Sequence, residues 1–459
     1  MKALKYLLFA IIPLFVFSSC ENDDGDNPSF ADDEIPRIFM DWQEYTARQV
    51  GDVLTYTPIV SPADGATYKW TLDGNVISTE KDLSYNITEE MIGVLEFEVT
   101  RKNATNSRTT NLLVPRDFVP KTYNKKSIAF VTGSGAIRDI DWDNITHLVV
   151  SSAVVDENGS LDESNFDDIN LSTMIIYAHH YGVYITLEVS GVLDSYVNAV
   201  PKYESYNFYN NAIAWNYQTL ADNIVAKVKE LGMDGLNVYM DKAAGGAFGD
   251  PASLATFYTY LGDKMKSEKN TVDGNEYDYI LSMSVVGGWT RGSLATCVNI
   301  PTYDWVNVLA FAAEDLTPGQ HSAQWYAEQE INVWLGWQGP IAPERVVLAV
   351  PAFGLRYFGI PSNYTWANLV EYTEYIPYKT ICSQYADAPS KSEIIITDNG
   401  GDNSKEVNKI YYNNPALIQT KVDFALSKNL AGMALWSIEN DSKEPGASLI
   451  KKMNEGLGN

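Results

Sequence analysis

Three polar side chains share one face of a short apolar segment, and they are the residues of this sequence best placed to do chemistry. The segment reads Met233-Asp234-Gly235-Leu236-Asn237-Val238-Tyr239-Met240-Asp241. Side chains alternate in direction along a strand, so Asn237, Tyr239 and Asp241 point to one side and the apolar residues between them to the other. Polar groups that face the inside of a protein need hydrogen-bonding partners or a ligand. The alternative to a ligand site is a buried polar network whose members satisfy one another.

The elements around this segment predict a barrel that would place it. Strand candidates alternate with helical stretches such as 171–181 and 219–231 across residues 125–459. The candidates are 127–131, 146–155, 183–189, 233–241, 279–286, 305–311, 346–350 and 432–436. Eight strands that alternate with helices are typical of a parallel (β/α)8 TIM barrel, in which sites lie at the C-terminal ends of the strands. Asp241 is then expected at the open end of the fourth strand.

A smaller β-rich module precedes the barrel. Residues 36–118 read as short strands separated by turns, which predicts a small β-sandwich. One strand is expected over 53–60, and another over 66–72 that ends in the tight hairpin Asp73-Gly74-Asn75. This region resembles a PKD or Ig-like module. Such modules usually act as spacers, and a spacer is expected here rather than an independent sugar binder. Residues 111–123, with two prolines, are expected to form the linker.

The beginning of the chain predicts an exported lipoprotein. Residues 1–19 carry two lysines and then a short apolar run, as a secretory signal peptide does. The run stops at small residues followed by Cys20, which resembles a bacterial lipoprotein signal with lipid added to the cysteine sulfur. The alternative is an ordinary signal peptide with an incidental cysteine. Residues 20–35 form an acidic tether that resembles the surface-export signal of Bacteroidetes lipoproteins. A lipid-anchored protein at the outer membrane and cell surface is therefore expected.

Composition narrows the classes of ligand. The chain has 59 acidic and 33 basic side chains and a net charge of -26, which disfavours nucleic acid and anionic membrane surfaces. Aromatic residues make up 12% of the chain, a surplus that sugar stacking or β-sheet packing could use. The four histidines show no metal-ligand spacing, so neither a metal nor a cofactor is expected. Cys297 and Cys382 could form one disulfide or remain as two free thiols.

The fourth strand resembles the signature of glycoside hydrolase family 18, which contains chitinases and endo-β-N-acetylglucosaminidases. That signature reads Asp-Gly-x-Asp-x-Asp-x-Glu. Segments 145–159, 304–308, 345–354 and 432–437 resemble the second, sixth, seventh and eighth strands of the family in the same order, so the resemblance covers about residues 126–455. It implies that Trp436, on the eighth strand, floors a sugar subsite.

The departures from the family pattern affect its catalytic groups. Members use the substrate's own acetamido oxygen as nucleophile and the closing glutamate of the signature as general acid. Here that position is Asp241, whose carboxyl is retracted by about 1.5 Å. The two preceding aspartates of the signature are Asn237 and Tyr239. On the sixth strand Phe311 and Ala312 replace Tyr and Asp. The resemblance therefore implies that Asp241 occupies a degenerate acid position with little turnover.

A further departure lies on the third strand, where Glu188 stands in place of the serine of Leu-Ser-x-Gly-Gly. Several aromatic residues nevertheless remain that could stack on sugar faces, namely Trp289, Phe311 and Trp436, with Asn237 and Tyr239 as polar binding candidates.

Three functional hypotheses follow. The first is a non-catalytic, surface-anchored protein that binds N-acetylglucosamine-containing glycans, such as an N-glycan core or a chitin oligosaccharide. By analogy with outer-membrane glycan import, its partners would be a TonB-dependent transporter and its lid lipoprotein. The second is an active endo-β-N-acetylglucosaminidase or chitinase in which Asp241, Glu188 or Glu439 acts as the acid. The third is a protein-interaction scaffold without a sugar ligand.

Overall fold

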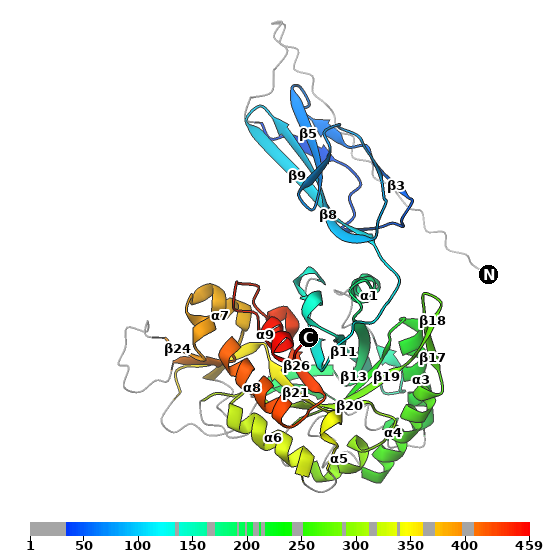
Figure 1. Cartoon of the computed structure of the whole chain (residues 1–459), viewed down its shortest axis with the longest axis vertical. Coiled ribbons are helices and arrows are strands. Elements are labelled where there is room, and N and C mark those ends of the chain that lie inside the picture. Colours follow the sequence, from blue (N-terminus) through cyan, green and yellow to red (C-terminus); the bar gives the residue numbers. More distant parts are fainter. Residues whose placement is uncertain are drawn as a thin grey trace, which may run out of the picture. The chain divides into compact units, whose positions relative to one another are not determined.

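The chain is divided into two compact units. The first runs to Leu112, except for the short segments Ala47–Val50 and Thr88–Ile92, which group with the second unit, Leu113–Asn459. Figure 1 colours the first unit in blues and the second from cyan to red. The computed structural model describes residues 34–133, 137–162, 170–190, 192–197, 200–204, 211–212, 216–240, 251–286, 291–311, 319–336, 340–360, 372–396 and 408–459.

From residue 34 onward, the first unit has strands as its regular secondary structure, as the sequence predicted for residues 36–118. Its strands are β1 (Arg37–Phe39), β2 (Tyr45–Ala47), β3 (Val53–Tyr56), β4 (Ile59–Ser61), β5 (Ala66–Leu72), β6 (Asn75–Ser78), β7 (Leu83–Asn86), β8 (Met91–Arg101) and β9 (Ala104–Val114). The largest sheet has the order β2-β9-β8-β5-β6, while β1 pairs with β4 and β3 with β7. Trp70 and Phe97 are fully buried, with ring centroids 4.4 Å apart, and they anchor the core of this unit.

Local turn chemistry explains two features of these strands. The hairpin between β5 and β6 forms where it was predicted, because Asp73 and Gly74 adopt φ angles of 49° and 78° that a tight hairpin turn requires. The expectation of one continuous strand over 53–60 is wrong. The segment breaks between β3 and β4, which pair in different sheets, since Pro58 has no N–H to contribute to a ladder.

The second unit contains a closed barrel of eight parallel strands, which confirms the predicted fold. The strands are β10 (Lys126–Val131), β11 (His147–Val155), β13 (Tyr184–Ser190), β16 (Gly235–Met240), β19 (Ile280–Val286), β20 (Trp305–Leu309), β21 (Val346–Pro351) and β26 (Gly432–Trp436). Their order is β10-β26-β21-β20-β19-β16-β13-β11, and pairing of β10 with β11 closes the ring.

Helices surround these strands on the outside, as Figure 1 shows for α3 to α6 and α8. The helices are α1 (Leu171–His180), α3 (Tyr217–Glu230), α4 (Pro251–Lys266), α5 (Arg291–Val298), α6 (Gln324–Gly336), α7 (Tyr378–Gln384), α8 (Pro415–Ser427) and α9 (Leu449–Gly456). The buried side chains of α3 recur at helical spacing, at Leu220, Ile224 and Val228, so one stripe of the helix faces the barrel.

The second unit also contains shorter strands that are not part of the eight-stranded ring. The sequence analysis did not predict them. An antiparallel sheet of order β23-β22-β25-β24 is inserted between β21 and α8. Its strands are β22 (Phe353–Tyr357), β23 (Thr373–Pro377), β24 (Glu393–Ile395) and β25 (Lys409–Tyr412). The others are β12 (Leu161–Asp162), which pairs with β11, and the hairpins of β14 (Val192–Val197) with β15 (Val200–Glu204) and β17 (Lys269–Val272) with β18 (Asn275–Asp278).

Aromatic side chains close the N-terminal end of the barrel. The Trp305 ring lies 5.1 Å from the ring of His147, which lies 5.4 Å from that of Tyr184. The Lys126 ammonium lies 5.0 Å from the Trp305 ring centroid. Burial lowers the pKa of His147 to about 3, so this histidine is neutral at physiological pH. The lumen is therefore a packed core at this end, and a site can open only at the other.

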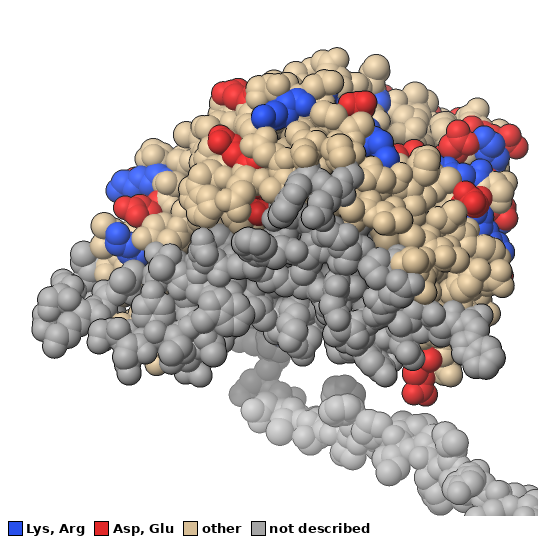
Figure 2. Space-filling model, turned by 90° about the horizontal axis from the view of Figure 1, so that it is seen from below, with Lys and Arg blue, Asp and Glu red and all other residues tan. Residues whose placement is uncertain are grey.

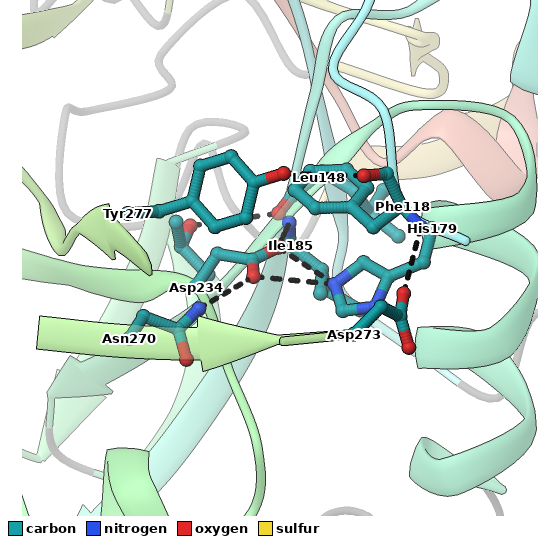
Figure 3. Close-up of polar contacts among 9 residues, drawn as sticks. Phe118, Leu148, His179, Ile185, Asp234, Asn270, Asp273 and Tyr277 are labelled. Carbon is teal, nitrogen blue, oxygen red and sulfur yellow. Dashed lines mark hydrogen bonds and ion pairs between the residues drawn. The ribbon is translucent and has the colours of Figure 1, made fainter. Parts of the chain in front are cut away.

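The segment that leads into the barrel is fixed to its surface by Phe118. Its ring is 1% exposed and lies 4.4 Å from His179 and 5.4 Å from Tyr277. Both backbone polar atoms of Phe118 are held as well: its N–H donates to Asp273 Oδ2 at 2.7 Å, and its carbonyl accepts from the Tyr277 hydroxyl at 3.2 Å (Figure 3). Residues 111–114, which were expected in the linker, are the last residues of β9.

The second unit contains two cysteines among its described residues. Cys297 and Cys382 are free and buried, so the open alternative between a disulfide and two thiols is settled in favour of thiols. Burial raises the pKa of Cys297 to about 12, which keeps that thiol protonated. Within the described residues, no helix combines the length and apolar character that a membrane span requires.

Removal of the Phe118 ring should weaken the barrel. We expect Phe118→Ala to lower the free energy of unfolding of the barrel by about 3–5 kcal/mol, because it empties a buried aromatic site. The neighbouring Val119 is 69% exposed, so Val119→Ala should change it by less than about 0.5 kcal/mol. Urea unfolding followed by tryptophan fluorescence measures both variants. Equal effects of the two substitutions would contradict the buried anchor.

Candidate functional site

The polar residues of the fourth barrel strand, β16, face a lumen that is divided into a polar and an aromatic half. Asn237 lies in the middle of the polar half and is fully buried. Its Oδ1 accepts from Ser282 Oγ at 2.8 Å and from Asn307 Nδ2 at 3.2 Å. Its Nδ2 donates to Ser284 Oγ at 3.0 Å and to Glu188 Oε2 at 2.6 Å. Asn237 thus uses its donors and acceptor within the protein, and a role in ligand binding remains a prediction.

Glu188 completes this network from the third strand, β13. It is fully buried and stands opposite Asn237 in the parallel register of β13 and β16. The hydroxyl of Ser151 donates to its Oε1 at 2.5 Å, while its Oε2 accepts the bond from Asn237. Both carboxylate oxygens are therefore engaged. A carboxyl group that is paired in this way, below the mouth of the barrel, is poorly placed to protonate a leaving group.

The aromatic half of the lumen brings together three of the residues that the sequence singled out. The Tyr239 and Phe311 rings each lie 6.2 Å from that of Trp436, and Phe130 stacks on Trp436 at 4.7 Å. All three predicted residues are buried, with exposures of 1% for Tyr239, 1% for Phe311 and 0% for Trp436. A sugar can therefore stack on Trp436 only after the atoms that cover its ring have moved.

Asp234, which opens the fourth-strand segment, has a structural task. It lies at the N-terminal end of β16 and is 2% exposed. Its Oδ2 accepts from the backbone N–H of Ile185 at 2.8 Å and contacts Nε2 of His179 at 3.1 Å, and its Oδ1 accepts from Asn270 Nδ2 at 2.9 Å. Figure 3 shows these contacts converging beside the Phe118 anchor. The carboxylate therefore joins strands at the end of the barrel opposite to the mouth.

Three of the predicted positions lie outside the described residues. These are Asp241 at the degenerate acid position, the stacking candidate Trp289 and the lipidation candidate Cys20. Their roles stay predictions. Among the described residues, no group of three or more His, Cys, Asp and Glu side chains is arranged to hold a metal ion.

A second carboxyl group lies at the mouth, after the eighth strand. Glu439 follows β26, and its Oε1 accepts from both the hydroxyl and the backbone N–H of Thr132, at 2.8 and 3.2 Å. Burial raises the pKa of Glu439 above its ordinary value. Next to it, Asn440 Nδ2 donates to the hydroxyl of Tyr375 at 2.6 Å, so the inserted sheet forms a wall beside this position.

Sequence reasoning missed most of the polar network. It noted Glu188 as a departure and as a candidate acid, but it did not connect this residue with Ser151, Ser282, Ser284 or Asn307. A signal was present, because Ser282 and Ser284 recur at every second position of an apolar strand and so share one face. Which strands these residues join depends on the register of the barrel, which single strands do not reveal.

Some exposed lysines of the barrel unit are paired with acidic side chains. Figure 2 shows acidic and basic side chains interspersed on the described part of the face in view. Lys264 lies 2.5 Å from Asp222, and Lys266 lies 2.8 Å from Asp304. Such exposed pairs contribute little to stability, but they break up any field of a single sign. A surface of this kind suits an uncharged ligand better than a polyanion.

Comparison with known families accounts for both units. Residues 121–441 match the sequence profile of glycosyl hydrolases family 18, and residues 36–99 match that of a PKD-like domain. The family 18 match covers the whole barrel and more than half of the chain. None of the curated proteins matches the sequence.

Solved structures of similar fold include several chitinases. A family 18 chitinase from the chitin utilization locus of Flavobacterium johnsoniae superposes with a TM-score of 0.54 at 18% identity, over 72% of this chain and 94% of that one. A chitinase from Bacteroides thetaiotaomicron gives 0.52 at 17%, over 73% and 96%. A point mutant of a class V chitinase from Nicotiana tobaccum, in complex with NAG4, gives 0.56 at 18%, over 73% and 99%. At these identities the likeness shows the fold alone.

A double-mutant cycle tests whether Glu188 and Asn237 act as a unit. Asn237→Asp places a second carboxylate 2.6 Å from the first, and we expect it to lower the free energy of unfolding by about 3 kcal/mol or more. Glu188→Ser alone should cost about 1–3 kcal/mol. The double variant restores one carboxylate and one hydroxyl, so it should be more stable than Asn237→Asp. Chemical denaturation measures all three.

Asn275→Asp is the matched control, because Asn275 is exposed and should tolerate the new charge within about 0.5 kcal/mol. A double variant no more stable than Asn237→Asp would show that the two residues are not coupled.

Proposed function

This chain belongs to glycosyl hydrolase family 18, and we propose that it is a lipid-anchored protein of the cell surface that binds N-acetylglucosamine-containing glycans without cleaving them. An N-glycan core or a chitin oligosaccharide is the ligand class. The observation that carries the proposal is the bond between Asn237 and Glu188. Where the family signature has a carboxylate, this chain has an amide whose donors and acceptor are engaged below the mouth of the barrel.

The next position on the strand argues in the same direction. Tyr239 packs in the aromatic cluster beside Trp436, where the signature has an aspartate. A phenol cannot supply the negative charge that would hold an acetamido group and tune a neighbouring acid. General acid catalysis is worth about 10² to 10⁴ in rate, and correct orientation of an internal nucleophile is worth more. A barrel without both retains little capacity for hydrolysis but can still bind sugar.

The aromatic half of the lumen is the proposed stacking surface, which a sugar reaches once the atoms that cover these buried rings have moved. Tyr239, Phe311 and Trp436 gather on one side, and aromatic rings offer the apolar faces on which pyranose rings stack. The Nicotiana tobaccum chitinase of similar fold was solved in complex with NAG4, which makes that oligosaccharide a suitable first probe.

Hydrolysis is the second candidate function, and one observation favours it. Glu439 is a buried carboxyl group at the mouth whose pKa is raised by burial, as that of a general acid would be. It follows the eighth strand, however, whereas the acid of the family signature closes the fourth. Glu188, the other candidate, has both oxygens engaged. We therefore propose binding as the primary function.

The proposed localisation at the cell surface rests on the sequence of residues 1–35. Cys20 after a short apolar run supports lipid attachment, and the acidic tether supports export to the outer surface. A TonB-dependent transporter and its lid lipoprotein are the proposed partners of such a glycan-binding protein. The PKD-like unit between tether and barrel is then a spacer that holds the barrel away from the membrane.

The proposal predicts binding without turnover. Calorimetry with NAG4 and with a high-mannose glycopeptide should detect binding to at least one of them. Prolonged incubation of either ligand at high protein concentration should yield no product by mass spectrometry. The Asp241→Ala variant should likewise yield no product. Cleavage by the natural chain that Asp241→Ala abolishes would establish the hydrolase instead, and no binding to either ligand would overturn the glycan proposal.

Lipid attachment predicts a change in partitioning. The natural chain, expressed in a bacterium that processes lipoproteins, should enter the detergent phase on Triton X-114 separation. Cys20→Ser removes the sulfur that would carry the lipid, so the variant should move to the aqueous phase. Ser19→Ala is the control and should behave as the natural chain does. Equal partitioning of Cys20→Ser and the natural chain would contradict the anchor.

A further inference from the structure

Three polar side chains form a cluster at the mouth of the barrel, where the first and eighth strands end. Thr132 directly follows β10, and Ser437 and Glu439 follow β26. The Thr132 hydroxyl lies 2.6 Å from Ser437 Oγ and donates to Glu439 Oε1 at 2.8 Å. We refer to Thr132, Ser437 and Glu439 as the strand-8 cluster. Thr132 lies two residues after Phe130, and Ser437 directly follows Trp436, whose rings stack on each other. The cluster therefore lies at the C-terminal ends of the strands, where barrels of this class carry their sites.

Two buried polar atoms of this region have no partner among the described residues. One is Oε2 of Glu439 and the other is Nε1 of Trp436. A buried donor or acceptor that lacks a hydrogen bond is costly, and such atoms are rare in native proteins. Here two occur three residues apart in one segment. Both lie at the mouth and not within the packed end of the lumen.

The buried amine of Lys421, elsewhere in this unit, does have hydrogen-bonding partners. Lys421 on α8 is fully buried, but its ammonium donates to Ser322 O, Ser322 Oγ and Asn413 Oδ1 at 2.5, 2.9 and 2.5 Å. Its amine thus has three acceptors, although burial lowers the pKa of Lys421 to about 7. Other buried polar atoms of the barrel unit also lack a partner among the described residues, such as Nε1 of Trp334 and Oε1 of Gln324. Glu439 and Trp436 differ from these in lying together at the C-terminal ends of the barrel strands, where a ligand would bind.

The chemistry of the two atoms defines what they can bind. An indole N–H only donates, so it needs a ligand oxygen. A carboxylate oxygen accepts from a hydroxyl or an amide N–H, and its second oxygen is already fixed here by two donors of Thr132. Burial raises the pKa of Glu439 because it disfavours the charged form, and this also disfavours a second anion nearby. The fitting ligand is neutral and carries both donors and acceptors.

We propose that Glu439 binds the ligand directly, through a hydrogen bond from a sugar hydroxyl or acetamido N–H to its Oε2, and that Thr132 holds the carboxylate in place for this contact. The inference rests on the proposed function and adds to it a residue outside the fourth-strand signature. Glu439 is thereby a binding residue, and Thr132 is a positioning residue.

Calorimetry of variants with NAG4 and with a high-mannose glycopeptide tests the proposal, and thermal unfolding of each variant is recorded in parallel. Glu439→Leu removes the acceptor and should weaken binding about 10- to 100-fold, as the loss of a hydrogen bond to a charged group does. Glu439→Gln keeps a polar group of similar shape and should weaken binding less. Thr132→Val removes one of the two donors to Oε1 and should weaken binding several-fold.

Glu444→Gln is the matched control, because Glu444 is exposed and five residues further along the same segment. Its affinity should equal that of the natural chain. The melting temperature of Glu439→Gln should be unchanged or higher, since a buried charge has been removed. A weaker affinity together with an intact melting temperature supports direct binding.

Unchanged affinity in Glu439→Leu and Thr132→Val overturns the inference while leaving the proposed function in place. A lower melting temperature with unchanged affinity overturns it too, because Glu439 is then structural only. If the natural chain binds neither probe, the proposed function is contradicted, and the inference that rests on it falls with it. If Glu439→Leu does not fold, Glu439→Gln and Thr132→Val decide, and both must weaken binding for the inference to stand.

Discussion

The hydrogen bond between Asn237 and Glu188 is the contact on which the interior of this barrel depends. A carboxylate that is fully buried must find donors, and Glu188 finds them in Asn237 and Ser151. The oxygen of Asn237 then needs donors of its own, which Ser282 and Asn307 supply. One buried carboxyl group thus links five neighbouring strands through hydrogen bonds between their side chains. Tyr239, two residues further along the same strand, packs in the aromatic half of the lumen instead.

This arrangement has a direct consequence for chemistry. A pair of carboxylates in hydrogen-bond contact repel each other unless they share a proton, so one site of this kind accommodates a single negative charge. With that charge at Glu188, an amide at position 237 is the compatible partner and a second carboxylate is not. The buried carboxyl group of the lumen therefore lies on the third strand, below the mouth, where the fourth strand contributes an amide. On the proposed function, position 237 supplies no carboxylate that could support an acid after β16.

Sequence reasoning predicted what local patterns determine. The eight barrel strands appeared where apolar runs alternate with helical stretches, and the inward direction of Asn237 and Tyr239 followed from the two-residue period of a strand. The break near Pro58 was missed because pairing in different sheets decides it. The inserted sheet of β22 to β25 was missed because its strands are short. The role of Glu188 could not be predicted, since it depends on which residue stands opposite across two strands that are 49 residues apart in sequence.

The position of Asp234 shows that contacts which hold the barrel together lie apart from its candidate site. Its carboxylate joins β13, α1 and the hairpin of β17 and β18 at the N-terminal end, through Ile185, His179 and Asn270. The candidate binding residues lie at the other end of the same strands. In a barrel of this class, stability is concentrated at the first end and chemistry at the second. Substitutions at the mouth therefore leave the contacts of Asp234 intact, so membership of the family fixes the fold without fixing the reaction.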